Sequence, residues 1–279
     1  MILVAGATAH FGRQAVESLV AAGHQVRALS RTPEAAGLPD GVEVVRGDLT
    51  QAATLAPALT GVTAVFLVLP YQMDPTAFLD AAREAGVGRI VFLSSGAVVE
   101  GADEQPDVIA AYHHGVERAI RANGAEWTFL RIFFPAINSL SFAMQLADGD
   151  VVRGPYAGAQ SAPVHEGDVG EVAARVLTED GHAGKVYELT GPESMTQAEQ
   201  VSTLGRVLGR PLSFEELDPE PVRAQMGQFM DPAFINALFD LMAATVGKPA
   251  PVNSLVADLT GRPARGYAQW VADHVADFS

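Results

Sequence analysis

Short apolar runs alternate with helical stretches through the first half of this 279-residue chain. Several runs are apolar on consecutive residues, as expected for strands covered on both faces. The helical stretches have apolar residues at three- and four-residue spacing and end at glycine or asparagine–glycine. This alternation is typical of a parallel, doubly wound α/β sheet with right-handed crossovers. We expect strands at residues 2–5, 25–29, 42–45, 64–69, 89–93 and 127–132, and helices at 11–22, 75–85 and 108–122.

The second half has a different pattern. A stretch rich in glycine, proline and small residues, 147–163, predicts a loop, and the acidic cluster at 215–218 predicts a solvated face. We expect a strand near 185–190 that returns to the sheet. Residues 1–138 are therefore expected to form the doubly wound domain, and residues 139–279 a small, mostly helical C-terminal lobe. The helices expected after the loop lie at 168–177, 197–208, 221–230, 232–246 and 267–278.

Composition excludes several classes of protein. The chain has 33 acidic and 18 basic side chains, a net charge of −15, so a nucleic-acid partner is not expected. It has no cysteine, which excludes disulfides, thiolate metal sites and a cysteine nucleophile. The N-terminus lacks the basic region of a signal peptide, and no apolar run approaches the roughly 20 residues of a membrane helix. We expect a soluble, cytoplasmic protein with no membrane partner.

A glycine-containing turn follows the first strand and precedes the first helix. It reads Gly6-Ala7-Thr8-Ala9-His10-Phe11-Gly12. In a dinucleotide-binding unit the first glycine permits the tight turn and the last lets helix and strand approach, while the helix N-terminus faces the pyrophosphate. Ala9 occupies the place where a middle glycine would bring backbone and phosphate together, and the alternative is a turn without a ligand. The cofactor-binding residues predicted here are Gly6, Thr8, Ala9, His10, Phe11 and Gly12.

The end of the second strand distinguishes the two nicotinamide dinucleotides. An acidic residue there would bind the ribose hydroxyls of NAD, whereas an arginine pairs with the 2′-phosphate of NADP. The chain has Ser30-Arg31 and no acid, so NADP(H) is favoured over NAD(H), unless Arg31 is an ordinary surface residue. After the third strand, Asp48, followed by Leu49, is placed either to meet the adenine amino group or to cap the next helix.

These residues resemble the short-chain dehydrogenase/reductase superfamily and, within it, the atypical NmrA-like branch. The resemblance implies an NAD(P)-binding Rossmann domain with a small substrate-binding lobe. Family enzymes include quinone, dye and azo reductases, ether and isoflavone reductases, and ketoreductases, whereas other members bind NADP and act as redox-sensing regulators. Besides the turn and Ser30-Arg31, the markers are Gly47-Asp48-Leu49, Val91-Phe92-Leu93-Ser94-Ser95, His113-His114-Gly115-Val116-Glu117, Trp127-Thr128-Phe129-Leu130-Arg131, Asn138, Gly167-Asp168-Val169 and Leu189-Thr190-Gly191-Pro192-Glu193.

The chain departs from the superfamily in its proton relay. Active members usually have Tyr-x-x-x-Lys on the helix after the fifth strand. Counted back from Glu117, the lysine position falls on His113 and the tyrosine position on Ile109, and Gly96 replaces the usual hydroxyl residue. A general acid contributes about 10²–10⁴-fold, so its loss argues for an electron-poor, conjugated acceptor that needs little protonation by the protein.

Three residues are candidates for catalysis. His113 is expected to contact the nicotinamide ribose or to act as a weak acid, although a structural helix histidine fits equally well. Tyr112 is a proton donor only if the helix is rotated. Of Ser94 and Ser95, at the carboxyl end of the fifth strand, one is expected to contact the ribose and the other to bond the turn. Because His113 and His114 point about 100° apart, they cannot share a metal ion.

The remaining candidates surround the same edge. Leu69 and Pro70 end the fourth strand beside the expected cofactor, and Phe133 either packs on the nicotinamide or belongs to the core. Asn138 is expected to hold loop backbone and Asp168 to cap a helix, and we predict no metal. Apolar pocket candidates in the lobe are Tyr156, His165, Met226, Met230 and Met242.

The sequence favours an NADPH-dependent reductase of a quinone or a polycyclic aromatic ketone, with a small aromatic molecule as its partner. An NADP(H)-sensing regulator without catalysis is the alternative from another class. A nucleotide-sugar epimerase is a weaker alternative, because alcohol deprotonation would suffer most from the missing tyrosine and lysine. The chain is expected to be a monomer or a homodimer.

Overall fold

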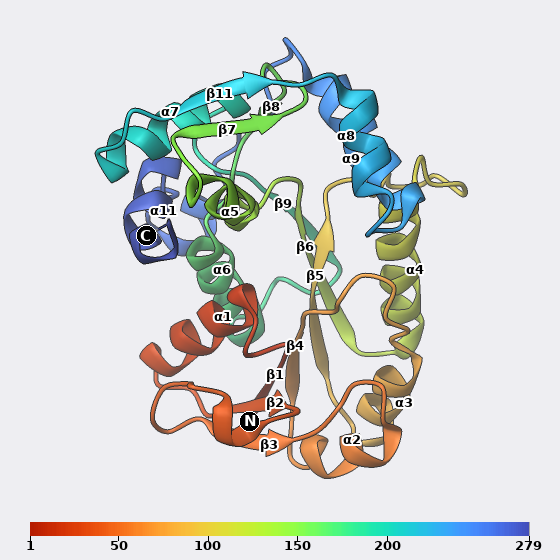
Figure 1. Cartoon of the computed structure of the whole chain (residues 1–279). Coiled ribbons are helices and arrows are strands. Elements are labelled where there is room, and N and C mark those ends of the chain that lie inside the picture. Colours follow the sequence, from red (N-terminus) through yellow and green to blue (C-terminus); the bar gives the residue numbers. More distant parts are fainter. Residues whose placement is uncertain (279) are drawn as a thin grey trace.

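The central sheet of the computed structural model, which describes residues 1–278, has seven parallel strands. Their order, β3-β2-β1-β4-β5-β6-β9, reverses direction between β1 and β4 (Figure 1). The predicted α/β class and the doubly wound sheet are confirmed. The strands are β1 (Ile2–Ala5), β2 (Val26–Ser30), β3 (Glu43–Arg46), β4 (Ala64–Leu67), β5 (Arg89–Ser95), β6 (Glu126–Ile132) and β9 (Lys185–Leu189).

Helices cover both faces of this sheet, which explains its apolar strands. In β1, Ile2 and Val4 pack into one core cluster, whereas Leu3 and Ala5 pack into the other. The first cluster lies under α1 (His10–Ala21), α6 (Glu166–Thr178) and α10 (Leu255–Thr260). The second lies under α2 (Ala52–Leu59), α3 (Thr76–Glu84) and α4 (Val108–Asn123), on the opposite side of the sheet (Figure 1).

A C-terminal lobe with its own core lies beyond the carboxyl ends of the central strands (Figure 1). Trp270 and Tyr267 stack in this core, at 5.5 Å between ring centroids, and Phe11 joins it to the core under α1. The lobe contains α5 (Ala143–Leu146), β7 (Val151–Gly154), β8 (Gln160–Ser161), β10 (Met195–Thr196), α7 (Gln197–Leu208), β11 (Ser213–Glu216), α8 (Pro219–Met226), α9 (Pro232–Thr245) and α11 (Tyr267–Asp273), with 3₁₀ turns at Ala136–Phe142 and Val275–Phe278; a further 3₁₀ turn, Pro33–Ala35, lies between β2 and β3.

One sequence prediction in the lobe is wrong, because the expected loop at 147–163 contains β7 and β8. The acidic cluster at 215–218 is exposed at Glu215, Glu216 and Asp218, as expected for a solvated face, and it overlaps β11, which pairs in parallel with β7. Both strands are short, and Arg153 of β7 pairs with Glu215 of β11 at 2.8 Å. Strands β7 and β11 stabilise each other although they lie about 60 residues apart in the sequence. Neither strand therefore has a local apolar pattern from which it could be predicted.

The start of α6 also differs from the prediction. Its N-cap is His165, whose Nδ1 accepts a hydrogen bond from the Gly167 amide at 2.9 Å. Asp168, the predicted cap, lies inside the helix, where its buried carboxylate accepts from the backbone N–H of Arg265 at 2.8 Å and pairs with the Arg265 guanidinium. An acidic residue in the first turn thus anchors the C-terminal segment rather than capping its own helix.

Helices α1 and α6 approach so closely that no side chain fits between them at Gly170. A Cβ at this residue would lie 2.5 Å from the carbonyl carbon of Gln14. This packing connects the opening strand–turn–helix to the second half of the chain. None of the helices within residues 1–278 combines the length and the apolar character needed to cross a membrane.

We predict that Gly170→Ala lowers the free energy of unfolding by about 1–3 kcal/mol, because the added methyl forces two backbones apart. Urea unfolding measures the change. The matched control is Gly115→Ala, on the outer face of α4 with nothing within 4 Å of its Cβ, which should gain about 0.5–1 kcal/mol of helix propensity. Equal stability of the two variants would contradict the close packing.

Candidate functional site

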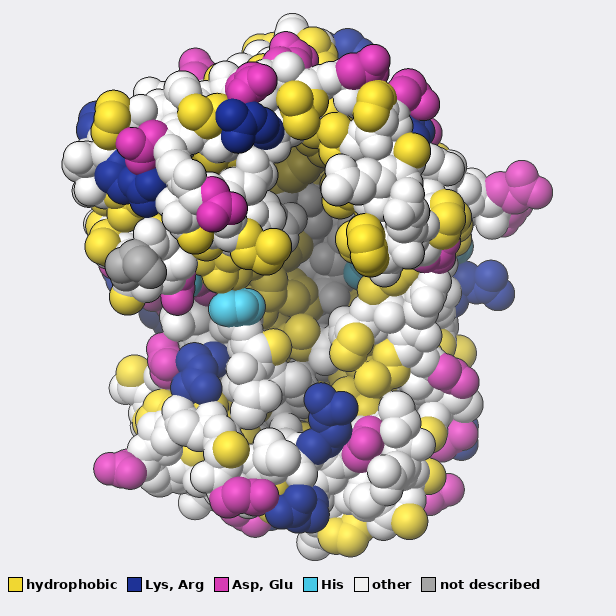
Figure 2. Space-filling model, in the orientation of Figure 1, with side chains coloured by type: hydrophobic (Ala, Val, Ile, Leu, Met, Phe, Trp, Pro, Cys, Tyr) yellow, Lys and Arg dark blue, Asp and Glu magenta, His cyan; other side chains and the backbone are white. Residues whose placement is uncertain are grey.

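A deep hollow with hydrophobic side chains on its walls opens between the α5–β7 side of the lobe and α8–α9 (Figure 2). It lies over the carboxyl ends of the central strands (Figure 1). In open α/β sheets, ligands bind outside the carboxyl ends of the strands, where the strand order reverses. Here the reversal falls between β1 and β4, so the loops that follow these two strands form the centre of the candidate site.

The predicted glycine turn follows β1 and is tightly constrained. Gly6 has φ +82°, and a Cβ on it would lie 2.9 Å from the Val68 carbonyl oxygen, just after β4. A Cβ on Gly12 would lie 2.6 Å from the Gly6 carbonyl carbon and closer still to its oxygen. The first glycine therefore serves the turn and the last allows α1 to approach β1, as the sequence predicted.

The N-terminus of α1 is free to receive an anion. Its N-cap, Ala9, has no capping side chain, and the first turn has no acidic residue. Backbone N–H groups therefore point out of the helix without a partner from an N-cap side chain. Thr8, Ala9 and His10 are exposed. Phe11 differs because its half-buried ring packs into two cores, so only its backbone can serve a ligand.

Arg31 stands at the end of β2 as an exposed cation. Within residues 1–278 its guanidinium has no hydrogen-bond or ion-pair partner, whereas the nearby Arg46 is paired with Glu34 at 2.9 Å. The Ser30 hydroxyl oxygen accepts a hydrogen bond from the Thr32 amide at 3.1 Å and so shapes the turn that carries Arg31. An unpaired guanidinium in this place fits a phosphate group.

Asp48 does not cap the helix that follows. Its Oδ1 accepts from the amide and hydroxyl of Thr50, at 2.9 and 2.7 Å, while α2 begins four residues later, at Ala52, with Gln51 as its N-cap. These two hydrogen bonds lower the pKa of the Asp48 carboxyl, which stays ionised. Leu49 packs against the core under α2. The predicted capping role of Asp48 is therefore wrong, and the adenine contact stays a prediction.

Tyr112 is not directed toward a substrate. Its hydroxyl donates to the carbonyl oxygens of Pro70 and Met73, at 2.9 and 3.0 Å, and so holds the loop after β4 against α4. Burial raises the pKa of Tyr112 to about 12. The predicted role as proton donor therefore conflicts with its geometry. Leu69 packs against the core and Pro70 is exposed beside it.

His113 is a neutral ring with a fixed tautomer. Its Nδ1 lies 2.8 Å from the Ile109 carbonyl oxygen, which only accepts, so Nδ1 carries the hydrogen and Nε2 the lone pair. Burial lowers the pKa of His113, which outweighs this hydrogen bond and the charge of Glu117. Nε2 can thus accept a hydrogen bond from a ribose hydroxyl, but a role as weak acid at neutral pH does not fit.

The two serines at the end of β5 have different partners. The Ser94 hydroxyl is buried and donates to Glu117 Oε1 at 2.7 Å, so the expected ribose contact of Ser94 does not fit. The Ser95 hydroxyl oxygen accepts from the Ala97 amide at 3.1 Å, as expected for the serine that bonds the turn. Ser95 is partly exposed, and of the two it is the one left for a ligand.

Sequence reasoning missed the ion pair beneath these serines. Glu117 and Arg131 are 0% and 2% exposed, and the carboxylate accepts two hydrogen bonds from the guanidinium, at 2.9 and 2.7 Å. Arg131 also reaches Glu100 at 2.7 Å. The pair joins α4, which carries His113, to β6. The available signal was an arginine inside an otherwise apolar strand, since such a charge requires a partner.

Other predicted residues divide between site and core. Phe133, just past β6, is 42% exposed, and its ring lies directly over Gly96 after β5. The Asn138 side chain makes no hydrogen bond within the described chain, so its predicted hold on loop backbone is not observed.

Tyr156 has φ 56°, and the centroid of its ring lies 6.1 Å from that of Phe239 of α9. In the lobe, Met226 and Met242 are half-buried and Met230 is exposed.

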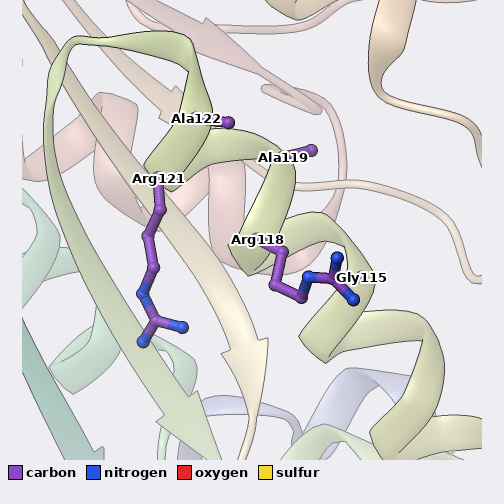
Figure 3. A pocket seen from close by; sticks show the side chains of 5 residues that line it. All are labelled: Gly115, Arg118, Ala119, Arg121 and Ala122. Atoms are coloured by element: carbon purple, nitrogen blue, oxygen red, sulfur yellow. The ribbon is translucent and has the colours of Figure 1, made fainter. Parts of the chain in front are cut away.

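The outer face of α4 has a shallow pocket of its own, lined by Gly115, Arg118, Ala119, Arg121 and Ala122. Figure 3 shows that the two guanidinium groups do not point toward one another, so they do not converge on one anion. Arg121 instead lies over the Trp127 ring, at 4.8 Å from its centroid. Among the described side chains, no group of three or more histidine, aspartate or glutamate residues is arranged to hold a metal ion.

The parallel sheet, the glycine turn at the strand reversal and the uncapped helix define a protein with a Rossmann-type, dinucleotide-binding fold. The chain belongs to the NmrA-like family, whose model matches residues 1–249.

Several of its relatives are named as reductases or oxidoreductases. A (4-alkanoyl-5-oxo-2,5-dihydrofuran-3-yl)methyl phosphate reductase of Streptomyces griseus is 42% identical over 100% of this chain and 99% of its own. An NAD(P)H azoreductase of Xenophilus azovorans is 31% identical, also over 100% of this chain and 99% of its own. The NADPH complex of the quinone oxidoreductase QOR2 of Escherichia coli has a TM-score of 0.80 at 27% identity, covering 99% of this chain and 100% of that one. This chain is an NAD(P)H-dependent reductase.

We predict that Glu117→Gln lowers the free energy of unfolding by about 3 kcal/mol or more, because a buried guanidinium loses its main counter-charge. Asp80→Asn is the matched control, since it removes one charge from the exposed pair with Arg83, at 2.9 Å. That variant should change stability by no more than about 1 kcal/mol. Similar small losses in both variants, measured by urea unfolding, would show that the buried pair is not a structural anchor.

Proposed function

We propose that the protein transfers hydride from NADPH to an electron-poor, conjugated acceptor such as a quinone or a polycyclic aromatic ketone. The observation that carries the proposal is the absence of a protein acid at the relay positions. Ile109 replaces the tyrosine, and His113 is neutral with its Nδ1 hydrogen on the Ile109 carbonyl. An acceptor that stabilises negative charge by conjugation needs little help from a general acid, whereas an isolated ketone needs more.

The residues of the site fit a nicotinamide dinucleotide. The α1 N-terminus and the turn from Gly6 to Gly12 would hold the pyrophosphate, since a Cβ at either glycine would collide with backbone or fill the turn. Arg31 would pair with the 2′-phosphate, and ionised Asp48 would accept from the adenine amino group. When bound, the dinucleotide supplies the hydride.

At the nicotinamide end, this chain's contribution is positioning. His113 Nε2 would accept from a ribose hydroxyl, and Ser95 and the loop of Leu69 and Pro70 would lie beside the nicotinamide ring. The buried pair of Glu117 with Arg131 fixes the position of α4, and with it His113, relative to β6. The hollow beneath the lobe opens to solvent (Figure 2), so the proton required after hydride transfer would come from water or from a neighbouring phenol of the acceptor.

The names of the relatives support this acceptor class. One reduces azo compounds, one is a quinone oxidoreductase, and one is named for an alkanoyl-dihydrofuranone phosphate, whose ring double bond is conjugated with two carbonyls. A structural neighbour described as a nucleoside-diphosphate-sugar epimerase is 17% identical and shares the fold alone. The missing tyrosine and lysine argue against epimerase chemistry here.

Steady-state oxidation of NADPH, followed by its absorbance with a panel of quinones, anthrones and acyl butenolides, tests the proposal. Turnover that falls as the acceptor becomes less electron-poor would support it. Tight binding of both NADPH and NADP⁺ without oxidation by any acceptor would overturn it and would favour the redox-sensing regulator.

We predict that Arg31→Glu weakens NADPH binding by about 10–100-fold and leaves NADH binding nearly unchanged, because one charge-assisted hydrogen-bond pair to the 2′-phosphate is lost and a repulsive carboxylate replaces it. Titration calorimetry measures both affinities. Arg118→Glu makes the same change of charge on the outer face of α4 and controls for the effect of net charge. If the two variants bind NADPH alike, the phosphate assignment is wrong.

We predict that Tyr112→Phe raises the KM for NADPH by a few-fold, because the loop after β4 loses its anchor, and preserves the shape of the pH–kcat profile. A general acid would instead contribute about 10²–10⁴-fold to kcat. Tyr187→Phe is the control, since it also removes a phenol hydroxyl with a hydrogen-bond partner. Tyr187 lies on β9, and its hydroxyl is 2.8 Å from His182 Nδ1. A fall of kcat by two orders of magnitude in Tyr112→Phe alone would restore the tyrosine as proton donor.

A further inference from the structure

An exposed aromatic ring rests on a glycine at the edge of the sheet where the acceptor must bind. Phe133 is 42% exposed, yet a Cβ added to Gly96 would lie 2.5 Å from its Cε2 and 2.7 Å from its Cγ. The ring of Phe133 contacts no other aromatic ring among the described residues. One side of the ring thus rests on the backbone at Gly96, while 42% of the residue is open to solvent.

The backbone on both sides of this ring is fixed. The Gly96 amide donates to the Ile132 carbonyl oxygen at 2.9 Å, which continues the pairing of β5 with β6 past the strand ends. On the other side, the Val164 amide donates to the Phe134 carbonyl oxygen at 3.0 Å, and the Ala136 amide donates to the Val164 carbonyl at 2.9 Å. Backbone hydrogen bonds therefore fix the segment that carries Phe133, and they hold its ring in the exposed position.

The Phe133 ring and a side chain at position 96 would occupy the same space. Gly96 occupies the position where the superfamily resemblance places a hydroxyl residue, and any side chain there would displace the Phe133 ring. The two features exclude each other, because a Cβ and the ring require the same space. The chain has an aromatic face where the usual relay would have a proton-donating group.

We propose that Phe133, seated on Gly96, is the residue that selects planar conjugated acceptors, by stacking its open face against the acceptor ring. This inference rests on the proposed reductase function and names the part of the site that recognises the acceptor. Offset or edge-to-face contacts between aromatic rings contribute a few-fold to about tenfold in affinity beyond the buried area. The effect grows with the area of the acceptor ring system and is absent for an acceptor without an aromatic ring.

The test compares Phe133→Leu and Gly96→Ala with the wild type. The acceptors are a naphthoquinone and cyclohexenone, at saturating NADPH. Both variants should lose a few-fold to about tenfold of the preference for the naphthoquinone, measured as the ratio of the two kcat/KM values. Gly88→Ala is the matched control, since its Cβ would make an ordinary contact, 3.6 Å from the Thr63 carbonyl oxygen.

Two results would overturn the proposal. An equal loss with both acceptors would show that the ring is only structural. A raised KM for NADPH with an unchanged acceptor preference would place the ring on the nicotinamide instead.

Binding without turnover separates this proposal from the proposed function. Calorimetry of the naphthoquinone with the NADP⁺-loaded protein should show binding to the wild type and weaker binding to Phe133→Leu. If the wild type binds the naphthoquinone through Phe133 but oxidises no NADPH, the reductase proposal fails and the proposed stacking on Phe133 is supported. If the wild type turns over cyclohexenone but does not bind the naphthoquinone, the proposed stacking on Phe133 fails and the reductase proposal is supported.

Discussion

The close approach of Gly12 to the Gly6 carbonyl, which leaves no room for a Cβ, is the constraint on which the rest of this structure depends. It brings the N-terminus of α1 to the point where the strand order reverses, and the opposite end of the same turn touches the loop after β4. Because α1 is in turn locked against α6 at Gly170, the second half of the chain is held relative to the cofactor turn. One close backbone approach thus fixes both the anion site and the lobe above it.

The site combines a glycine turn and helix N-terminus that fit a dinucleotide with a proton relay whose usual tyrosine and lysine are missing. The positions that would supply a phenol and an ammonium group hold Ile109 and a neutral His113. The nearby phenol of Tyr112 and the hydroxyl of Ser94 are both engaged in structural hydrogen bonds. Under the proposed function, the hollow would position the hydride donor and the acceptor, and such positioning accounts for a large part of catalysis when the acceptor is already electron-poor.

Buried charge gives this positioning its rigidity. Glu117 and Arg131 connect the helix that carries His113 to the strand that leads to Phe133, and Asp168 and Arg265 connect α6 to the C-terminal segment. Each pair is buried at its carboxylate and spans two elements that the chain brings together from separate regions. Such pairs restrict register and orientation more than they add stability, because desolvation offsets much of their attraction.

The sequence by itself determined the doubly wound sheet, the glycine turn and the exposed arginine, because each depends on a local pattern: apolar runs, glycine spacing, or a residue type at a strand end. It could not determine the partners of Ser94, Tyr112 and His165, since a side chain's partner depends on elements that meet only in the folded chain. Only the tertiary structure placed the Phe133 ring on Gly96. The reason is physical: a collision between a ring and an absent Cβ exists only after two parallel strands have been brought side by side.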